Sequence, residues 1–399
     1  MNAQRYYPVL LVLMISALLT SASAQNLQSY SFYGQNGSYP SGGLVRDNAG
    51  NFYGVTASGG GAANAGIVYE INSTFEATLY TFQGNSNGNS DGANPIGNLI
   101  FDSAGNLYGV TTQGGISTCT GGCGTVFELS PPSSPGGAWT ESVLYRFQQN
   151  SSTDGAFPMA GLVFDTGGNL YGTTEVNGGV EGVGTVFELS PPSEPGGVWT
   201  ETLLHTFQNY PTDGAYPVSQ LILDSAGNLY GTTQNGGANT YGCVFEVSPP
   251  SQPGGAWSET VLHSFYKMDG TNPLAGLTWG PGGALFGVTT IYGPNLWGTL
   301  FRMYPTGQGT WNYYVVYGFS SGDSPTSPVV FASPATLYGT TNSGGIVYEI
   351  SYSGGKATFT ELANPGASDA QLLLSQGAIY GTTSSGGAYF KGQVYRLSR

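Results

Sequence analysis

The sequence predicts an all-β fold, a seven-bladed β-propeller made of four-stranded blades. The first observation is a unit of the form Tyr-Gly-(Val/Thr)-Thr, or a close variant, that recurs at intervals of 42 to 63 residues. Its copies begin at Tyr53, Tyr108, Tyr171, Tyr230, Phe286, Tyr338 and Tyr380. The second observation is that each copy holds four short β-branched or aromatic runs bounded by Gly, Pro, Asn and Asp, with no competing helical periodicity. Four-strand units of this length are typical of propeller blades.

The best-preserved copy shows the order of the four expected strands. Strand A covers residues 161–165, and the tight turn Thr166-Gly167-Gly168-Asn169 leads into strand B at 170–174. Strand C follows a glycine-rich loop at 184–189, and a Pro-Pro-Ser-x-Pro-Gly-Gly segment separates it from strand D at 199–207. Since adjacent strands are antiparallel, the D–A and B–C connections emerge on one face of the ring and the A–B and C–D turns on the other. The variable D–A and B–C loops predict that any ligand site lies on the first face.

The two ends of the chain predict ring closure. The last copy stops after its strand C, at residues 393–397, whereas Tyr30-Ser31-Phe32 matches strand D alone. The N-terminal strand is therefore expected to close the last blade and to remove an open sheet edge.

Composition narrows the class of protein. Of 399 residues, 65 are Gly, 13% are aromatic and 8% are charged, which is too aromatic for a disordered chain. The formal net charge of −14 argues against nucleic-acid binding, because phosphate neutralisation needs a basic face.

Residues 1–24 have the pattern of a signal peptide, and residues 25–399 are expected to form one domain. Arg5 precedes an apolar run from Val9 to Leu19, and Ala22-Ser23-Ala24 presents small residues at the expected cleavage site. The run is too short to span a bilayer. We therefore expect a secreted or periplasmic, monomeric protein without a membrane span after cleavage.

The repeats resemble the GloVer family, tandem repeats of unknown biochemical function in exported bacterial proteins. Gly105-Asn106-Leu107-Tyr108-Gly109 and the run Gly124-Thr125-Val126-Phe127-Glu128-Leu129, with their equivalents, carry this resemblance. Asp-x-x-Gly-Asn before strand B is more weakly similar to NHL-type propellers. The resemblance implies no catalytic residues.

A polar residue precedes strand A in every blade and forms the first candidate site. The set comprises Asn36, Asp91, Asp154, Asp213, Asp269, Asp323 and Asp369. One interpretation is an Asx turn that accepts a backbone N–H two residues on. The other is an acidic mouth that binds Ca²⁺ as the one possible cofactor.

Aromatic residues in the B–C loops form a second candidate site on the same face. They are Tyr241, Tyr292, Trp297, Tyr389 and Phe390. Aromatic rings beside Asn, Asp and Gln suit sugars or protein partners. The sequence thus favours a binding or scaffold module for envelope or extracellular glycans or proteins.

The alternative function is a polysaccharide hydrolase or lyase, which requires a carboxylate pair. The repeat pattern does not explain Glu175, Glu181 and Glu194. Glu175 and Glu181 share the third B–C loop, whereas strand parity puts Glu194 on the opposite face. His205 and His263 both replace the Tyr of strand D and are interpreted as packing substitutions. With only two histidines in the chain, a Ser-His-Asp triad is hard to assemble and a His-rich zinc site is excluded.

The three cysteines divide into two kinds. Cys119 and Cys123 lie in one B–C loop and are expected to form a local disulfide in an exported protein. Cys243 replaces the Thr that begins strand C and is expected to pack as a small buried thiol.

Overall fold

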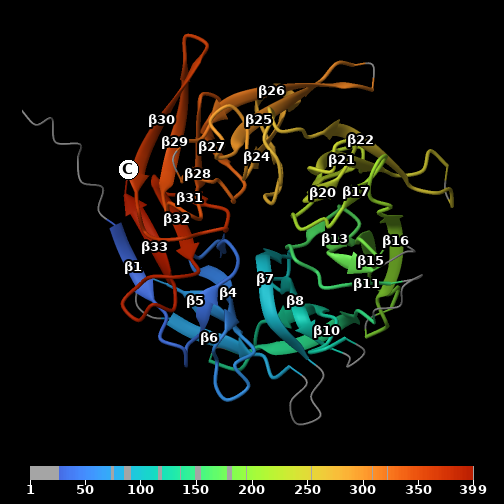
Figure 1. Cartoon of the computed structure of the whole chain (residues 1–399). Helices are drawn as coiled ribbons and strands as arrows, with labels where there is room; N and C mark the ends of the chain where they lie inside the picture. The colour runs from blue at the N-terminus through green and yellow to red at the C-terminus, as the bar shows by residue number, and fades with distance from the viewer. Residues whose placement is uncertain are drawn as a thin grey trace, which may run out of the picture.

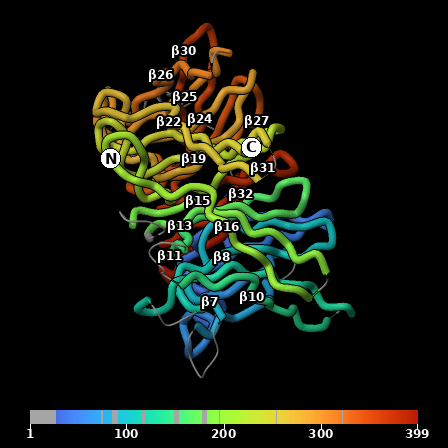
Figure 2. The backbone as a smooth tube through the Cα atoms, turned by 90° about the vertical axis from the view of Figure 1, so that its right-hand side faces the viewer, coloured from blue at the N-terminus to red at the C-terminus, as the bar shows by residue number. Residues whose placement is uncertain are grey.

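The computed structural model describes residues 27–398 except 73–75, 85–90, 116–118, 135, 149–153, 178–181, 195, 253, 308 and 321. In this part of the chain nearly all regular structure is β, with a 3₁₀ turn at Pro281–Gly283. Seven four-stranded antiparallel blades surround a central channel, which confirms the expected propeller (Figure 1). Their connections project to both sides of the ring, which Figure 2 shows edge-on.

Each blade runs from an inner strand A to an outer strand D. Blades 1 and 2 contain β3 (Val45–Arg46), β4 (Phe52–Ser58), β5 (Ile67–Ile71) and β6 (Glu76–Thr81), then β7 (Gly92–Phe101), β8 (Leu107–Gly114), β9 (Thr125–Ser130) and β10 (Thr140–Arg146). Blades 3 and 4 contain β12 (Val163–Phe164), β13 (Leu170–Thr174), β15 (Thr185–Ser190) and β16 (Thr200–Thr206), then β18 (Ile222–Leu223), β19 (Leu229–Thr233), β21 (Cys243–Ser248) and β22 (Ser258–Ser264). Blades 5 and 6 contain β23 (Thr278–Trp279), β24 (Leu285–Thr289), β25 (Thr299–Pro305) and β26 (Trp311–Gly318), then β27 (Val330–Ser333), β28 (Thr336–Thr340), β29 (Val347–Ser353) and β30 (Lys356–Ala363).

The seventh blade joins the two ends of the chain. It consists of β31 (Leu373–Ser375), β32 (Ala378–Thr383), β33 (Gln393–Ser398) and β1 (Leu27–Ser31). Strand β1 pairs antiparallel with β33, from Leu27 opposite Leu397 to Ser31 opposite Gln393 (Figure 1). The expected closure by the N-terminal strand is therefore confirmed, and it gives β33 a partner on its outer side.

The D–A and B–C connections share one face, as strand parity predicts. Short strands in the D–A segments pair with the B–C side of the same blade. These are β2 (Ser38–Pro40) with β4, β11 (Gly155–Ala156) with β14 (Val176–Asn177), and β17 (Gly214–Ala215) with β20 (Asn235–Gly236). We call this side of the ring the loop face.

A glycine under an aromatic ring explains the Tyr-Gly unit. A Cβ on Gly172 would lie 2.6 Å from the Phe187 ring, which comes from the neighbouring strand of the same blade. The same conflict with the aromatic side chain of strand C arises at Gly54, Gly109, Gly231, Gly287, Gly339 and Gly381. Only glycine leaves room for this ring, so the unit recurs in every blade.

The ring of strand C also contacts the preceding blade. Phe147, which follows β10, meets Phe187 edge-to-face with 5.3 Å between ring centroids. Equivalent pairs are Phe32–Tyr69, Phe82–Phe127, Phe207–Phe245, Phe265–Phe301 and Phe319–Tyr348. All these side chains are at most 1% exposed, so the blades are joined through aromatic contacts that exclude water.

The A–B turn is organised by an aspartate. Asp165 accepts hydrogen bonds from the backbone N–H groups of Gly167 and Asn169, from the Asn169 side chain and from the Tyr171 hydroxyl. Asp47, Asp102 and Asp224 bind their turns in the same way. The Asp-x-x-Gly-Asn pattern is thus a hydrogen-bonded turn on the side opposite the loop face.

In the part of the chain that the structure describes, no helix has the length and apolar character needed to cross a membrane.

Tyr348→Phe should stabilise the protein. The Tyr348 side chain is fully buried, and no described residue contacts its hydroxyl through a hydrogen bond. Blades 2 to 5 carry Phe at this position, so removing the hydroxyl should raise the free energy of unfolding by about 1 kcal/mol in urea denaturation. Tyr338→Phe is the control, since that hydroxyl donates to Glu349 at 2.9 Å and its loss should destabilise. Equal destabilisation by both variants would contradict this account of the buried hydroxyl.

Candidate functional site

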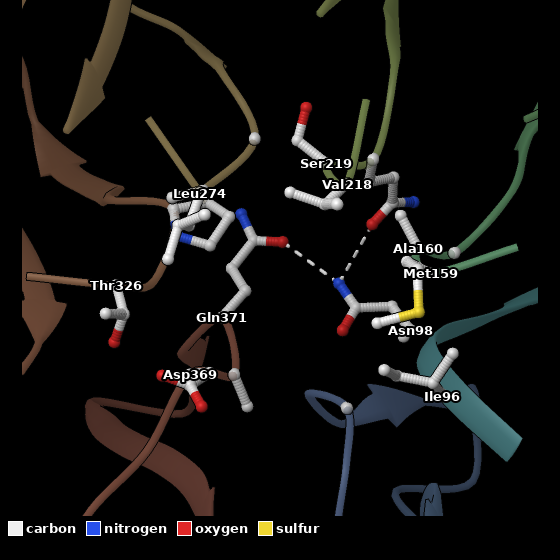
Figure 3. A pocket seen from close by; sticks show the side chains of 18 of the residues that line it. Ile96, Asn98, Met159, Ala160, Val218, Ser219, Leu274, Thr326, Asp369 and Gln371 are labelled. Carbon is white, nitrogen blue, oxygen red and sulfur yellow. Dashed lines mark hydrogen bonds between the residues drawn. The ribbon is translucent and has the colours of Figure 1, made fainter. Parts of the chain in front are cut away.

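The mouth of the central channel forms a cavity on the loop face. The inner segments of all seven blades, within or just before strand A, line this cavity, whose volume is about 280 Å³. Its walls combine apolar side chains, among them Ile96, Met159 and Leu274, with the hydroxyl groups of Ser219 and Thr326 (Figure 3). Such a concave site with a few polar groups is the usual form of a small-molecule pocket.

The seven blades differ at the position that reaches the channel axis. This position precedes the first apolar residue of the inner segment and is occupied by Gly43, Asn98, Gly161, Gln220, Gly276, Pro328 and Gln371. Four blades therefore leave space there, whereas three blades place an amide side chain in it.

The three amides bind one another across the channel. The Asn98 Nδ2 atom donates to the Oε1 atoms of Gln220 and Gln371, at 3.2 Å each (Figure 3). The Asn98 Oδ1 atom accepts the Gly43 N–H at 2.7 Å, and the Gln220 amide donates to the Leu162 carbonyl at 2.8 Å. Asn98, Gln220 and Gln371, here called the amide cluster, form the uncharged floor of the cavity.

A second cavity begins beyond the amide cluster. Its volume is about 440 Å³, and its walls come from strand A residues such as Phe164, Ile222 and Leu223. Gln220 and Gln371 line both cavities. The amide cluster therefore lies between the cavity at the mouth and the cavity in the lower channel.

The backbone around the mouth is held in an uncommon conformation. Tyr39, Phe157 and Tyr216 each have a φ of 58°, in the left-handed region that residues other than glycine rarely adopt. Their N–H groups donate to B–C loop carbonyls of the preceding blade, at Lys391, Cys123 and Val183. Asn94 and Asn272 repeat the arrangement. Contacts between blades thus hold strained segments at the rim of the candidate site.

Exposed aromatic side chains lie further out on the loop face. Phe390 is 80% exposed and Tyr389 is 59% exposed, and the Tyr389 ring lies 6.0 Å from that of Tyr33. Nearby, the Lys391 ammonium lies 5.4 Å from the ring of Tyr39. We call Tyr33, Tyr39, Tyr389, Phe390 and Lys391 the seam patch, because they flank the junction of blades 7 and 1.

A second aromatic group lies on blades 4 and 5. The Tyr241 and Tyr292 rings are 6.5 Å apart, Lys267 lies 5.2 Å from the Tyr292 ring, and Trp297 is 42% exposed. None of the aromatic residues selected from the sequence, in either group, lines the channel mouth. They lie outside its lining, at the junction of blades 7 and 1 and on blades 4 and 5.

The seven polar residues that precede strand A differ in their exposure to solvent. Asn36, Asp91, Asp154, Asp213 and Asp269 are buried between blades, whereas Asp323 is partly exposed and Asp369 is exposed. Of the seven, Asp369 lines the channel mouth, where it accepts a 2.6 Å hydrogen bond from Asn342.

The buried members bind the end of the preceding strand D. Asp91 accepts hydrogen bonds from the Tyr80 hydroxyl and the Gln83 N–H, and Asp213 contacts His205 and accepts the Gln208 N–H. The Asx-turn interpretation expects each carboxylate to accept an N–H from two residues further along the chain. The partner comes from the preceding strand instead, because the D–A segment folds back against that strand.

A glutamate of the next blade lies beside several of these aspartates. Burial and the neighbouring Asp154 raise the pKa of Glu201 to about 8, and burial beside Asp91 raises the pKa of Glu141 to about 7. Burial also raises the pKa of Asp154 to about 6. Two carboxyl groups in a shielded place favour the proton-bound form.

The histidines replace tyrosines that bind the same aspartates. His205 contacts Asp213 through Nε2 at 3.0 Å, and His263 contacts Asp269 at 2.8 Å. Neither histidine lines the channel mouth.

The remaining candidates lie in the B–C loops. Glu175 is partly buried, which raises its pKa, and Glu181 lies outside the described residues. Cys119 and Cys123 form a disulfide with a Cα–Cα distance of 5.2 Å. Cys243 is fully buried and lies 3.2 Å from the Thr233 hydroxyl, where other blades place a Thr–Thr pair.

The amide cluster was missed by sequence analysis. Its signal is a comparison of the copies at the residue before the first apolar residue of the inner segment, where glycine gives way to Asn98, Gln220 and Gln371. Neutral amides carry neither a charge nor an aromatic ring, so they do not stand out among the polar residues of the repeat.

Comparison with known proteins identifies the repeat. The family model of the Gloeobacter/Verrucomicrobia repeat matches residues 18–200 and 86–279. Among curated proteins, none matches the chain.

Solved structures of several differently named proteins are similar to this chain in fold. Virginiamycin B lyase from Staphylococcus aureus is 15% identical, with a TM-score of 0.56 over 94% of this chain and 99% of that one. PorZ, a surface component of the type-IX secretion system of Porphyromonas gingivalis, is 16% identical, with a TM-score of 0.58 over 92% of this chain and 47% of that one. A puromycin-hydrolyzing peptidase of Mycobacterium tuberculosis is 11% identical, with a TM-score of 0.56 over 92% and 54% of the two chains. At these identities the similarity shows the fold alone.

The Glu201 carboxyl should make stability depend on pH. Its pKa in the folded protein, about 8, exceeds the value of about 4.3 in an unfolded chain. The protonated form therefore supports the fold, and this contribution is complete below pH 4.3 and is lost as pH rises through 8. Glu201→Gln keeps a neutral side chain, so its free energy of unfolding should exceed that of the unmodified protein at pH 8 and approach it near pH 4. Urea denaturation across this range measures the difference. Glu194→Gln, at an exposed position, should show none, and parallel pH profiles for Glu201→Gln and the unmodified protein would contradict the assignment.

Proposed function

The chain belongs to the Gloeobacter/Verrucomicrobia repeat family, and from this premise we propose that it is an exported propeller that binds neutral glycans at the channel mouth. The observation that carries the proposal is the cavity whose floor is the amide cluster. Amide groups both donate and accept hydrogen bonds, which complements the hydroxyl groups of a sugar. The signal-peptide pattern of residues 1–24 supports export.

The size and charge of the cavity favour one uncharged ring. Its volume of about 280 Å³ lies near the lower end of ligand pockets, about 300 Å³. Asp369 is the one charged residue among the described residues that line it, and that carboxylate is hydrogen-bonded to Asn342. A terminal sugar unit fits this description better than an anionic or cationic group.

The aromatic residues of the loop face would contact the rest of a bound chain. The exposed rings of Tyr389 and Phe390 offer apolar faces that pack against the C–H side of a pyranose. They do not line the mouth, so the proposal assigns them to units beyond the first. Protein partners, which could use the same exposed rings, are the competing outcome of the test.

The hydrolase alternative receives less support. A glycosidase needs two carboxyl groups at the scissile bond. Asp369 is the sole carboxylate among the described residues of the channel mouth, and Glu175 does not line it. Binding without cleavage is therefore the function we propose.

A glycan array with purified residues 25–399 should show saturable binding to neutral glycans. Runs with Ca²⁺ and with chelator test whether the acidic residues before strand A add a calcium requirement. Recovered glycans should be unchanged in length, since the proposal includes no cleavage. A silent array would reject the sugar proposal, and shortened glycans would restore the hydrolase alternative.

Gln371→Ala should weaken glycan binding about tenfold, because it removes one hydrogen-bonding group of the cavity floor. Isothermal titration with a glycan identified on the array measures the change. Gln252→Ala is the matched control, since Gln252 is exposed in a C–D connection on the opposite side of the ring. Equal affinity of both variants for the glycan would place the ligand elsewhere.

A further inference from the structure

The junction of blades 3 and 4 gathers three side chains that can bind a metal ion. His205 lies near the end of β16, Asp213 lies in the following D–A segment, and Glu259 lies on β22 of the next blade. One ligand atom from each lies within 4.8 Å of the other two. Two of the three residues lie on outer strands, and none of them lines the channel mouth.

The cluster is largely shielded from solvent, but one of its side chains remains partly exposed. Asp213 is 6% exposed, and its carboxylate contacts the His205 Nε2 atom at 3.0 Å. The side chain of His205 remains 19% exposed, which leaves a path for an ion. The Glu259 Oε1 atom is shielded from solvent, and no described residue donates a hydrogen bond to it. A shielded carboxylate oxygen without a hydrogen bond, beside a second carboxylate, has no donor to offset the cost of its burial.

The other blades show what is special about this junction. At two junctions the histidine position holds Tyr instead, in the sets Tyr80, Asp91, Glu141 and Tyr145, Asp154, Glu201. At the junction of blades 4 and 5 the histidine is present, but Tyr313 stacks on His263 at 4.0 Å in the place of the glutamate. Among these four junctions, only that of blades 3 and 4 combines an imidazole with two carboxylates.

We propose that His205, Asp213 and Glu259 bind a divalent transition-metal ion, with Zn²⁺ as the preferred occupant. Imidazole and carboxylate ligands suit Zn²⁺, whereas Ca²⁺ takes oxygen ligands. In a tetrahedral Zn²⁺ site with bonds of about 2.0–2.1 Å, ligand atoms lie about 3.3 Å apart. The present separations require only side-chain adjustment to reach this geometry, and water fills the fourth position.

The ion would join two blades outside the channel. His205 and Asp213 belong to the end of blade 3 and the segment that follows it, whereas Glu259 belongs to blade 4. Binding to the folded state alone raises its stability by mass action. The site is therefore a structural link between blades, independent of any glycan in the channel.

Isothermal titration of the metal-free protein with Zn²⁺ should show one saturable site and a rise in melting temperature. His205→Tyr, which reproduces the side chain of the two preceding junctions, should weaken Zn²⁺ binding by more than about tenfold and abolish the rise. Glu259→Gln should do the same while keeping the shape of the side chain.

Two variants serve as matched controls. His263→Tyr removes the histidine that lacks a glutamate partner, and Glu201→Gln alters the tyrosine-containing set. Both should bind Zn²⁺ like the unmodified protein. The proposal is overturned if the unmodified protein shows no saturable binding, or if His205→Tyr binds Zn²⁺ with unchanged affinity.

Discussion

The ring depends on an aromatic side chain that lies over a glycine in one blade and meets a phenylalanine of the blade before it. Phe187 covers Gly172 and contacts Phe147, and six of the seven junctions repeat this pairing. The glycine lets the ring lie flat against its own sheet, so that its edge and face remain available to the neighbour. Since the contact is apolar and fully buried, it tolerates wide variation in the loops that leave the blade.

A scaffold of near-identical blades obtains a specific site by varying one position per blade. The residue that reaches the channel axis is glycine in three blades and proline in a fourth, which leaves room for Asn98, Gln220 and Gln371. A full circle of amides would crowd the axis, and a full circle of glycines would leave no floor. The three amides come from blades 2, 4 and 7, so the site has none of the symmetry of the fold.

The fold could be predicted from the sequence because blade structure is local. Strand order and closure by β1 follow from the repeat and from the missing strand of the last copy. The site depends instead on which side chains meet across the axis, and Asn98 and Gln371 are 273 positions apart. The acidic residues before strand A show the same limit, because their partners lie on the preceding strand D. The sequence shows that Asp91 recurs, but only the fold-back of the D–A segment brings it to Tyr80.

Polar residues shared by most copies support the architecture, and those that occur in one or a few copies are available for function. Asp165 and its equivalents use their oxygens within the turn, and Asp91 and its equivalents use theirs between blades. The position of Asn98 holds glycine or proline in four of the other copies, so the scaffold does not need an amide there. The Asn98 amide instead forms hydrogen bonds across the channel. His205 stands between the two classes, because it keeps the structural bond to Asp213 while exchanging a phenol for an imidazole. One substitution at a supporting position thus changes the chemistry of a junction without changing its geometry, which is how a repeat protein gains a second site beside its channel.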